Sequence, residues 1–410
     1  ISWNILSSEL CTSNYFRHND PEDLEAPTRL ARVLQKLQDP VDRGAILCLQ
    51  ECSIRWSGHL HTFFQQRGYH FVTSHYGLQF DGYMGIGIAF PSRKFELLAT
   101  SMQRVSEGKA WDRERRPEVP PGKKLLTTLL DFAGYFASPL LLRQADDTDE
   151  FEDSNEDPWV YSRKRQNTMI MLRLRPRQEQ QAPFVVATYH MPCSFMLPKV
   201  MVIHSALAAQ CACRFAGDLP LVLAGDFNFK PGSAPYQLLT TGTLPQSHPA
   251  HPGTPPGPAW TLEKGLREFR SAYAEKNHGG EPEFTNYAWV GDDLDPFIGT
   301  LDYIFISKQT EVVAVGRLPN IRNCPQPMPT KAEPSDHLMV SARLRPYGGA
   351  APEIEQKLKS GSLSRPGQPV TSARPVAETK GTEGRGRVFG GSRVGSFLRS
   401  RTTTGGDIER

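Results

Sequence analysis

The segment of residues 221–236, LVLAGDFNFKPGSAPY, constrains the fold of this chain more than any other stretch. Its apolar first half predicts a buried strand that stops at Gly225, and Asp226 and Asn228 follow before the chain turns at Pro231 toward a short helix. A carboxylate fixed at the end of a rigid strand can orient a water molecule or a metal ion. Because Gly, Asp and Asn are also common in turns, the segment alone leaves a catalytic site and a simple turn equally open.

Strand-like and helix-like segments alternate along most of the chain. Apolar runs predict strands at residues 1–6, 45–51, 69–75, 84–90, 168–174, 184–190, 301–307, 312–318 and 338–344. Apolar residues at helical spacing predict helices around residues 27–37, 60–68 and 200–215. This alternation is typical of an α/β domain, in which the helix at 200–215 would be a crossover between strands. The polar and aromatic segment 283–290 fits either an edge strand or a loop that faces a ligand.

Two parts of the sequence depart from this alternation. Between Arg104 and Arg165, prolines, one apolar helix-like run and an acidic run predict an insertion in a solvated loop. Residues 348–410 contain few apolar residues and hold 11 Lys and Arg against 6 Asp and Glu, which leaves about −2 of the net charge of +3 for the rest. We therefore expect one large domain over residues 1–347, with the insertion at 104–165, and a basic disordered tail. The tail either binds acidic partners or only keeps the chain soluble.

The cysteines and the apolar runs bear on the compartment. Seven cysteines without paired spacing or a Cys/His ligand pattern indicate free thiols in a reducing, intracellular compartment. No apolar run reaches the length of a transmembrane segment, and no leader of charged and then apolar residues opens the chain. The chain starts at Ile1 without Met, inside an expected strand, so we expect a fragment or a processed product.

Polar residues that suit a metal or a phosphate lie at the ends of the predicted strands. They are Asn4, Glu51, His190, Asp226 with Asn228, Asp302, and Asp336 with His337. Each one alone fits a strand terminator or a satisfied histidine, but strand ends in packed sheets can converge at one mouth. Carboxylate and amide oxygens suit Mg²⁺ or Mn²⁺, and no HExxH or Cys/His cluster favours zinc. Amides and histidines suit phosphate oxygens, while the absence of a G-x-x-x-x-G-K-[ST] loop argues against nucleotide-driven phosphoryl transfer.

These motifs, taken in order, carry a resemblance to a known family. The set WN, LQE, TYH, GDFN, LDYIF and SDH resembles the endonuclease/exonuclease/phosphatase superfamily of Mg²⁺-dependent phosphodiesterases and phosphomonoesterases. It covers nearly all of residues 1–346, and EFTNYAWV ahead of LDYIF is most similar to the branch of the CCR4 deadenylases, nocturnin and angel proteins. The resemblance implies a DNase I-like fold, which is a four-layer α/β sandwich of two packed mixed β-sheets flanked by helices.

The resemblance also implies a cofactor and the residues that hold it. Glu51 would be the principal ligand of Mg²⁺, with Mn²⁺ as an alternative ion, and Asn4 would help. Asp336 would stay near the metal and the leaving oxygen of the substrate. The chemistry agrees, because hydrolysis of a phosphoester needs a cation for the charge that develops.

Five further residues receive catalytic roles from the resemblance. Asp226 would orient or deprotonate the attacking water. His190 and Asn228 would hold the scissile phosphate. His337 would contact the phosphate and stabilise the transition state, with Asp302 as its hydrogen-bonded orienter. Such groups typically supply about 10² to 10⁴ in rate.

The implied function is a metal-dependent phosphodiesterase, with RNA 3′ ends as the substrate that the deadenylase branch indicates. A nucleotide, an inositol phosphate and a sphingolipid are alternatives, because the body of the chain is slightly acidic and a groove that tracks a nucleic-acid strand is expected to be basic. A catalytically weak RNA-binding or protein-binding scaffold is another, although the intact set of acids, amides and histidines argues against it. Tyr287, Trp289 and Phe297 form either a base-stacking wall or packed surface aromatics.

Overall fold

The computed structural model describes residues 1–77, 82–111, 157–178, 181–254 and 260–347. Contacts divide the chain into residues 1–367 and 368–410, and every described residue belongs to the first unit. The predicted tail and the helix-like run of the predicted insertion lie outside the described residues.

The first sheet has four strands in the order β1-β2-β4-β3. They are β1 (Ser2–Asn4), β2 (Leu47–Gln50), β3 (Tyr69–Tyr76) and β4 (Met84–Pro91). β1 and β2 are parallel, and the other neighbours are antiparallel. A Cβ atom at Gly85 would lie 2.3 Å from the carbonyl oxygen of Cys52, so this glycine permits a close backbone approach.

The second sheet has six strands in the order β5-β6-β7-β8-β12-β9. They are β5 (Phe95–Arg104), β6 (Thr168–Pro176), β7 (Phe184–His190), β8 (Leu221–Asp226), β9 (Arg270–Ser271) and β12 (Asp302–Ile306). β7 and β8 are parallel and the other pairs are antiparallel, so both large sheets are mixed, as predicted. The predicted crossover is confirmed, because α7 (Pro198–Ala216) joins β7 to β8.

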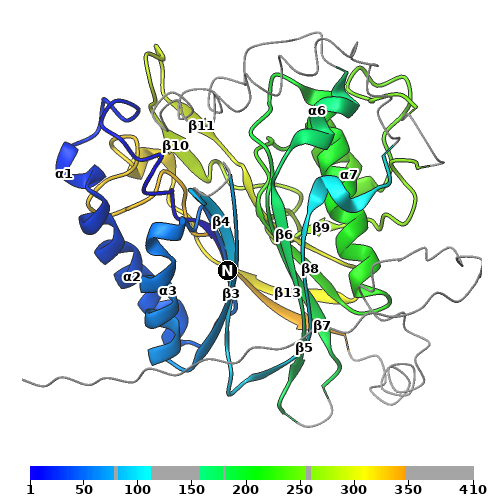
Figure 1. Ribbon diagram of the computed structural model, residues 1–410, viewed down its shortest axis with the longest axis horizontal. Helices are drawn as coiled ribbons and strands as arrows, with labels where there is room; N and C mark the ends of the chain where they lie inside the picture. The colour runs from blue at the N-terminus through cyan, green and yellow to red at the C-terminus, as the bar shows by residue number, and fades with distance from the viewer. Residues whose placement is uncertain (78–81, 112–156, 179–180, 255–259, 348–410) are drawn as a thin grey trace, which may run out of the picture. The chain divides into compact units, whose positions relative to one another are not determined.

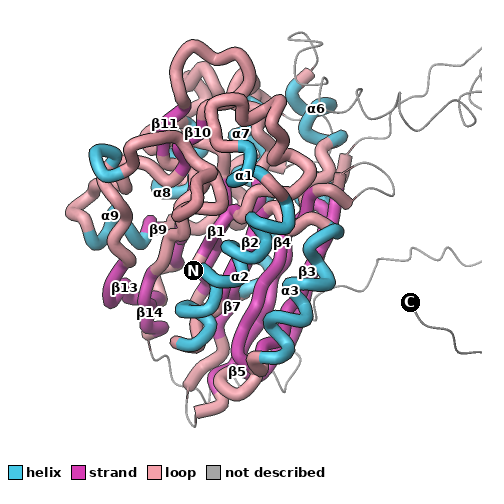
Figure 2. The backbone as a smooth tube through the Cα atoms, turned by 90° about the vertical axis from the view of Figure 1, so that its left-hand side faces the viewer, coloured by secondary structure: helices cyan, strands magenta, loops and turns pink. Residues whose placement is uncertain are grey.

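Helices cover the outer faces of both sheets (Figure 1). On the first sheet these are α2 (Ala26–Asp42) and α3 (Ile54–Gln66), which lie in front of the strands in Figure 2. The short α1 (Pro21–Leu24) directly precedes α2 and packs Leu24 against the turn after β1. On the second sheet, α6 (Pro158–Lys164), α7 and α8 (Ala234–Thr241) form the outer layer. α2 begins with proline in its first turn, where the missing N–H costs nothing, and it buries Val33 and Leu37 against the sheet.

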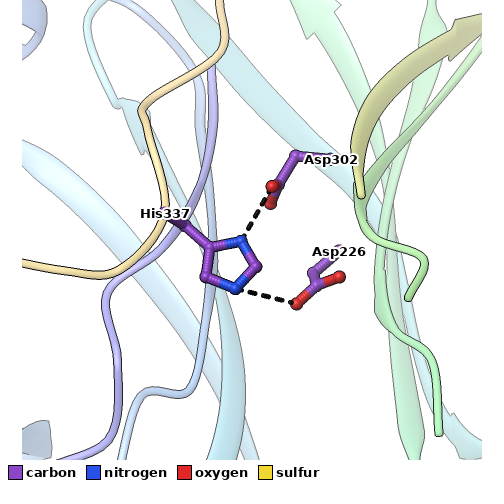
Figure 3. Close-up of side chains that lie close together, drawn as sticks. All are labelled: Asp226, Asp302 and His337. Atoms are coloured by element: carbon purple, nitrogen blue, oxygen red, sulfur yellow. Dashed lines mark hydrogen bonds and ion pairs between the residues drawn. The ribbon is translucent and has the colours of Figure 1, made fainter. Parts of the chain in front are cut away.

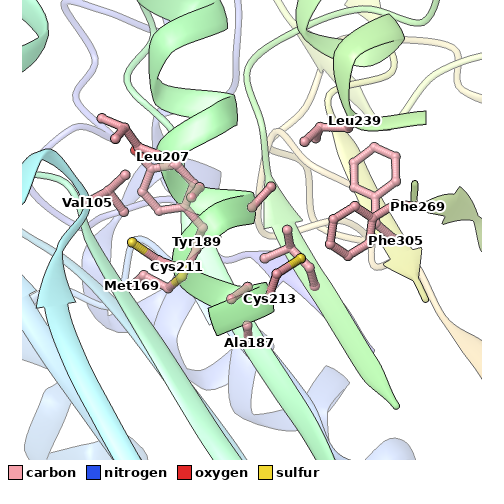
Figure 4. Packing of buried hydrophobic residues seen from close by; sticks show 14 of the residues in the cluster. Val105, Met169, Ala187, Tyr189, Leu207, Cys211, Cys213, Leu239, Phe269 and Phe305 are labelled. Carbon is pink, nitrogen blue, oxygen red and sulfur yellow. The ribbon is translucent and has the colours of Figure 1, made fainter. Parts of the chain in front are cut away.

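Apolar side chains fill the spaces between these layers. Ile86 and Ile88 of β4 meet Leu172 of β6 and Ile304 of β12 in a cluster between the two sheets. A larger cluster joins the outer face of the second sheet to α7, and Figure 4 shows part of it. Burial of this apolar surface holds the sheets face to face and fixes which strand ends meet.

Two short antiparallel sheets complete the fold. β10 (Asn286–Ala288) pairs with β11 (Phe297–Gly299), and β13 (Thr310–Val315) pairs with β14 (Ala342–Pro346). The prediction of a last strand at 338–344 is therefore wrong in position, because within that range the bridge between Ser2 and Val340 is isolated and the strand begins at Ala342. The predicted strand at 312–318 likewise starts earlier and ends earlier. α9 (Ala272–Lys276) follows β9, and neither was predicted.

The described ends of the predicted insertion belong to the packed body. A 3-10 helix, η1 (Val105–Gly108), follows β5, and α6 precedes β6. Val105 and Trp159 are buried in the cluster on α7. The prediction of a solvated loop is therefore wrong for both ends of the insertion.

Two chemical predictions concern the described residues. All seven cysteines lie among them, and no disulfide joins any of them within the described ranges. Within these ranges, no helix has both the length and the apolar character that a membrane span requires.

Candidate active site

Three predicted site residues lie side by side across the second sheet. The register of the parallel pair places His190 of β7 beside Asp226 of β8, and the antiparallel pair places Asp302 of β12 on the other side of Asp226. All three side chains are buried. A Cβ atom at Gly225 would lie 1.9 Å from the carbonyl oxygen of Tyr189, so only glycine lets β7 and β8 meet at this row.

The first sheet reaches the same row through Asn4. The Nδ2 atom of Asn4 lies 2.8 Å from Oε1 of Glu51 and 3.0 Å from Oδ2 of Asp226. The other oxygen of Glu51 accepts a hydrogen bond of 2.7 Å from the backbone N–H of Ser7. One amide therefore joins a carboxylate that follows β2 to a carboxylate that ends β8.

His337 lies between two carboxylates (Figure 3). Its Nδ1 atom is 2.8 Å from Oδ2 of Asp302, and its Nε2 atom is 3.7 Å from Oδ2 of Asp226. Burial alone would lower the pKa of His337, but Asp302, Asp226 and Asp336 together raise this pKa well above its ordinary value. Burial also raises the pKa of Asp302 to about 6, although His337 opposes this shift. The shared proton therefore resides on the imidazole, as in a histidine oriented by a carboxylate.

His190 and Asn228 complete the surroundings of Asp226. Nε2 of His190 lies 3.6 Å from Oδ2 of Asp226, and its Nδ1 atom lies 3.1 Å from the hydroxyl of Tyr76. The backbone N–H of Asn228 donates to Oδ1 of Asp226 at 3.0 Å, and its side-chain Nδ2 donates to the carbonyl of Met191 at 2.8 Å. Both oxygens of Asp226 are thus fixed in direction.

Asp336 lies beside this group, on the segment before His337. Its Oδ2 atom accepts a hydrogen bond of 3.2 Å from Nδ2 of Asn286. Burial raises the pKa of Asp336, and the charge of Glu51 adds to the effect, while His337 and Arg29 oppose it. Asp336 and Glu51 therefore repel each other, and a cation between such carboxylates would relieve the repulsion.

Backbone strain also concentrates at this site. Leu6, Glu51 and Asn228 have φ angles of +55°, +59° and +51°, in the left-handed region that few residues other than glycine occupy. Such conformations cost about 1 to 3 kcal/mol each and persist where the surroundings hold them. The turns after β1, β2 and β8 are therefore held in place by the site itself.

Two groups of residues are candidates for holding a metal ion. Ligand atoms of Asp226, Asp302 and His337 lie within 4.8 Å of one another. However, the hydrogen bond between His337 and Asp302 uses one atom of each, and a protonated imidazole cannot bind a metal. The carboxylates of Glu51, Asp336 and Asp226 are the hard oxygen ligands that Mg²⁺ or Mn²⁺ prefers, although in the described part of the chain only the first group brings three ligand atoms within 4.8 Å of one another.

Several residues that support the site were not among the predicted site residues. Oγ1 of Thr285 accepts the backbone N–H of Asp302 at 3.1 Å, and Asn286 binds Asp336. Thr285 and Asn286 come from the segment 283–290, whose polar composition was a signal of a possible role. The segment contains the edge strand β10 and also borders the site. Tyr76 lies within a strand and Arg29 within a helix, where nothing in the spacing indicates a role.

The three aromatic residues of the predicted stacking wall do not share one face. Tyr287 is opposite Ile298 in the β10–β11 pair, whereas Phe297 is opposite Ala288, so the side chains of Tyr287 and Phe297 point to opposite faces. Tyr287 is buried in a core cluster. Trp289 stacks on the ring of His18 with a centroid distance of 3.8 Å.

The chain is similar to several known proteins. A human 2′,5′-phosphodiesterase 12 is 30% identical over 35% of this chain and 22% of its own length. A Ccr4 3′-5′-exoribonuclease subunit from Phaeosphaeria nodorum is 36% identical over 31% of this chain and 20% of its own length. A carbon catabolite repressor protein 4 homolog 2 from Arabidopsis thaliana is 25% identical over 76% of this chain and 51% of its own length. This chain thus spans about half or less of these relatives.

Solved structures share the fold. ANGEL2, described as a 2′,3′-cyclic phosphatase, superimposes with a TM-score of 0.59 at 19% identity, over 84% of this chain and 94% of that chain. The catalytic domain of human nocturnin superimposes with a TM-score of 0.50 at 16% identity, over 84% and 92% of the two chains. The family model described as the Endonuclease/Exonuclease/phosphatase family matches residues 1–337. The chain therefore belongs to the endonuclease/exonuclease/phosphatase family, and it resembles the branch of CCR4, nocturnin and angel proteins.

Proposed function

We propose that this chain is a Mg²⁺-dependent phosphoesterase that hydrolyses phosphodiester bonds, with residues 1–347 as its catalytic domain. The observation that carries the proposal is the position of Asp226. One of its oxygens lies 3.0 Å from the amide of Asn4, 3.6 Å from Nε2 of His190 and 3.7 Å from Nε2 of His337. A carboxylate surrounded by donors where the two sheets meet suits the activation of a water molecule beside a bound phosphate.

The side chains around Asp226 would divide the reaction among them. Asp226 would orient the attacking water and accept its proton. His337, whose pKa the neighbouring carboxylates raise well above its ordinary value, would donate a hydrogen bond to a phosphate oxygen and offset the developing charge. Asp302 would keep the ring of His337 in orientation through Nδ1. His190 would bind a second phosphate oxygen. The side-chain amide of Asn228 has two N–H groups; one donates to the carbonyl of Met191, and the other would donate to the phosphate.

Glu51 and Asp336 would hold the metal ion, with Asn4 fixing the direction of Glu51. When bound, the ion supplies positive charge at the phosphate and at the leaving oxygen. The mutual repulsion of Glu51 and Asp336 supports this assignment, since it makes the pair a favourable place for a cation. Hydrogen bonds from Ser7 and Asn286 would orient the two carboxylates, as outer partners of metal ligands do.

The names of the relatives support a proposal for the substrate class. They describe a 2′,5′-phosphodiesterase, a 3′-5′-exoribonuclease and a 2′,3′-cyclic phosphatase, and all three activities act on phosphate esters of ribose. We infer that this chain acts on a ribonucleotide phosphoester, with the 3′ end of RNA as the first candidate. A free nucleotide, an inositol phosphate or a sphingolipid would need the same chemistry on another leaving group.

A substrate panel with Mg²⁺ tests this proposal. It contains oligo(A) RNA, 2′,5′-linked oligoadenylate, RNA with a 2′,3′-cyclic phosphate, single-stranded DNA, NADP(H), inositol phosphates and sphingomyelin. Asp226→Asn and His337→Ala should each lower the turnover of the preferred substrate by about 10² to 10⁴. His59→Ala, at an exposed position of α3, is the matched histidine control and should leave turnover unchanged. If the unsubstituted chain turns over none of these compounds, a binding scaffold becomes the better description.

A further inference from the structure

Arg29 occupies a position where the pattern of its helix calls for an apolar residue. It lies one and two turns before Val33 and Leu37, on the face of α2 that packs against the first sheet, and its exposed fraction is 0%. Its guanidinium lies over the ring of Trp56, 5.0 Å from the ring centroid. A buried arginine is costly unless its charge and its N–H groups find partners, so its surroundings indicate what it does.

The guanidinium of Arg29 binds the backbone on both sides of the proposed metal site. Nε donates to the carbonyl of Pro334 at 2.8 Å. Nη2 donates to the carbonyls of Ile5 and Leu6 at 2.8 and 2.7 Å. Pro334 comes two residues before Asp336, and Ile5 follows Asn4 directly. One rigid side chain therefore joins the turn after β1 to the segment that carries Asp336.

The turn that Arg29 holds is one of the strained ones. Leu6 has a φ angle of +55°, and the next residue, Ser7, donates its backbone N–H to Glu51. A second bond ties the same two segments together, because the hydroxyl of Ser335 donates to the carbonyl of Asn4 at 2.7 Å. Loss of the arginine would let the turn relax, and the N–H that fixes Glu51 would move with it.

The charge of Arg29 also acts on the carboxylates of the site. Burial lowers the pKa of Arg29, while the thiol of Cys11 and the carboxylates of Asp336 and Glu51 raise it. The guanidinium is thus a buried positive charge that acts on two proposed metal ligands from a distance, and its Nη1 atom has no hydrogen-bond partner among the described residues. A positive charge near a Mg²⁺ site repels the ion, so charge and positioning affect Mg²⁺ binding in opposite directions.

We propose that Arg29 is a positioning residue that sets the geometry of Glu51 and Asp336 for a metal ion by joining the two backbone segments beside them. This inference rests on the proposed function. It gives a role at the site to a residue of a helix, whereas the motifs recognised in the sequence all lie at the ends of strands. Partners that orient metal ligands typically contribute about 10- to 100-fold to metal affinity. Loss of the positive charge alone would strengthen Mg²⁺ binding, whereas loss of positioning would weaken it. The direction of the change in Mg²⁺ affinity therefore reports the positioning role.

Two substitutions separate positioning from charge. Arg29→Lys keeps the charge but loses the planar fork that reaches three carbonyls, and Arg29→Met loses both. Mg²⁺ binding to the full chain is measured by titration calorimetry, with thermal unfolding as a check of the fold. We expect both variants to bind Mg²⁺ about 10- to 100-fold more weakly, and a saturating Mg²⁺ concentration to restore most of the turnover.

A matched control exists in the second sheet. Arg173 is 6% exposed, donates to the carbonyl of Phe215 at 2.9 Å and lies over that residue's ring, but it joins β6 to the end of α7. Arg173→Lys should lower the unfolding temperature without changing Mg²⁺ affinity. If Arg29→Met does not fold, Arg29→Lys and Ser335→Ala decide. Ser335→Ala removes the hydrogen bond to the carbonyl of Asn4 and should weaken Mg²⁺ binding to a smaller extent.

The outcomes distinguish the role of Arg29 from the proposed function. Wild-type or tighter Mg²⁺ binding by the Arg29 variants would overturn the positioning role, while the metal-dependent reaction would stand. If the unsubstituted chain binds no Mg²⁺, the proposed function itself is wrong. Weaker binding by the Arg29 variants with unchanged binding by Arg173→Lys supports the inference.

Discussion

His204 makes the stability of this protein depend on pH in a way that can be measured apart from the active site. The residue lies in α7 and is completely buried. Its Nε2 atom is 3.1 Å from the carbonyl oxygen of Ser162, and its Nδ1 atom is 2.9 Å from the hydroxyl of Tyr189. A carbonyl can only accept, so Nε2 carries the proton and Nδ1 accepts from the hydroxyl. The neutral imidazole is therefore fully satisfied.

Burial lowers the pKa of His204 from 6.5 to about 4. Between these two pH values the unfolded chain binds a proton that the folded chain does not, so the contribution of His204 to stability falls as the pH falls. With about 1.4 kcal/mol per unit of pKa difference, the free energy of unfolding should decrease by about 2 kcal/mol from pH 7.5 to pH 5 because of this one group. The loss should approach about 3 kcal/mol near pH 4.

The assay compares urea unfolding of the unsubstituted chain and of His204→Gln at pH 7.5 and pH 5, followed by tryptophan fluorescence. Glutamine can still donate to Ser162 but cannot take up a proton, so the variant should lose about 2 kcal/mol less than the unsubstituted chain between the two pH values. Other groups titrate in both proteins and cancel in this difference. His59→Gln, at an exposed site, should show the full pH dependence. An equal loss of stability in the unsubstituted chain and in His204→Gln would refute the reasoning.

Three further perturbations follow from the geometry of the site. Asp302→Asn removes the carboxylate that lies 2.8 Å from its histidine partner, so kcat should fall by about 10² or more and the acidic limb of the pH–rate profile should move, which steady-state kinetics between pH 5 and 9 would show. Gly225→Ala places a methyl group 1.9 Å from the carbonyl oxygen of Tyr189, so the free energy of unfolding should fall by more than about 3 kcal/mol, and a soluble variant with an unchanged unfolding temperature would contradict this. Tyr76→Phe removes the hydroxyl that lies 3.1 Å from His190, so kcat should fall by up to about tenfold with little change in thermal unfolding, and unchanged kinetics would exclude a part for this hydroxyl.

The sequence carried the local chemistry of the site but not its assembly. Each strand end with a polar residue could be recognised, because apolar runs stop where a titratable residue begins, as at His190 and Asp226. Which strands are neighbours depends on packing between residues far apart in the chain, and no local pattern records it. The row of His190, Asp226 and Asp302 is a result of register across β7, β8 and β12.

Other misses have similar physical causes. β5 is an edge strand with a half-exposed alternation, so its sequence lacks the continuous apolar run that marked its neighbours. The last strand was placed too early, because Leu338 and Val340 are buried by the core and not by a strand ladder. The role of Arg29 could not be predicted from the sequence, because an arginine in a helix usually lies in solvent. Its burial is favourable only because carbonyls of distant segments accept its hydrogen bonds.

The bridge between Ser2 and Val340 has a consequence for the order of events during synthesis. Trp3 donates its indole N–H to the carbonyl of His337 at 2.9 Å. β1 can pair with β2 early, but it cannot complete its contacts until nearly the whole domain has left the ribosome. Contacts of such long sequence separation form late, because loop closure must come first. A nascent chain with Asn4 and Glu51 in place but without the last segment lacks Asp336 and His337. Catalytic competence and the completed fold should therefore arise in the same step, and an incomplete chain should remain inert.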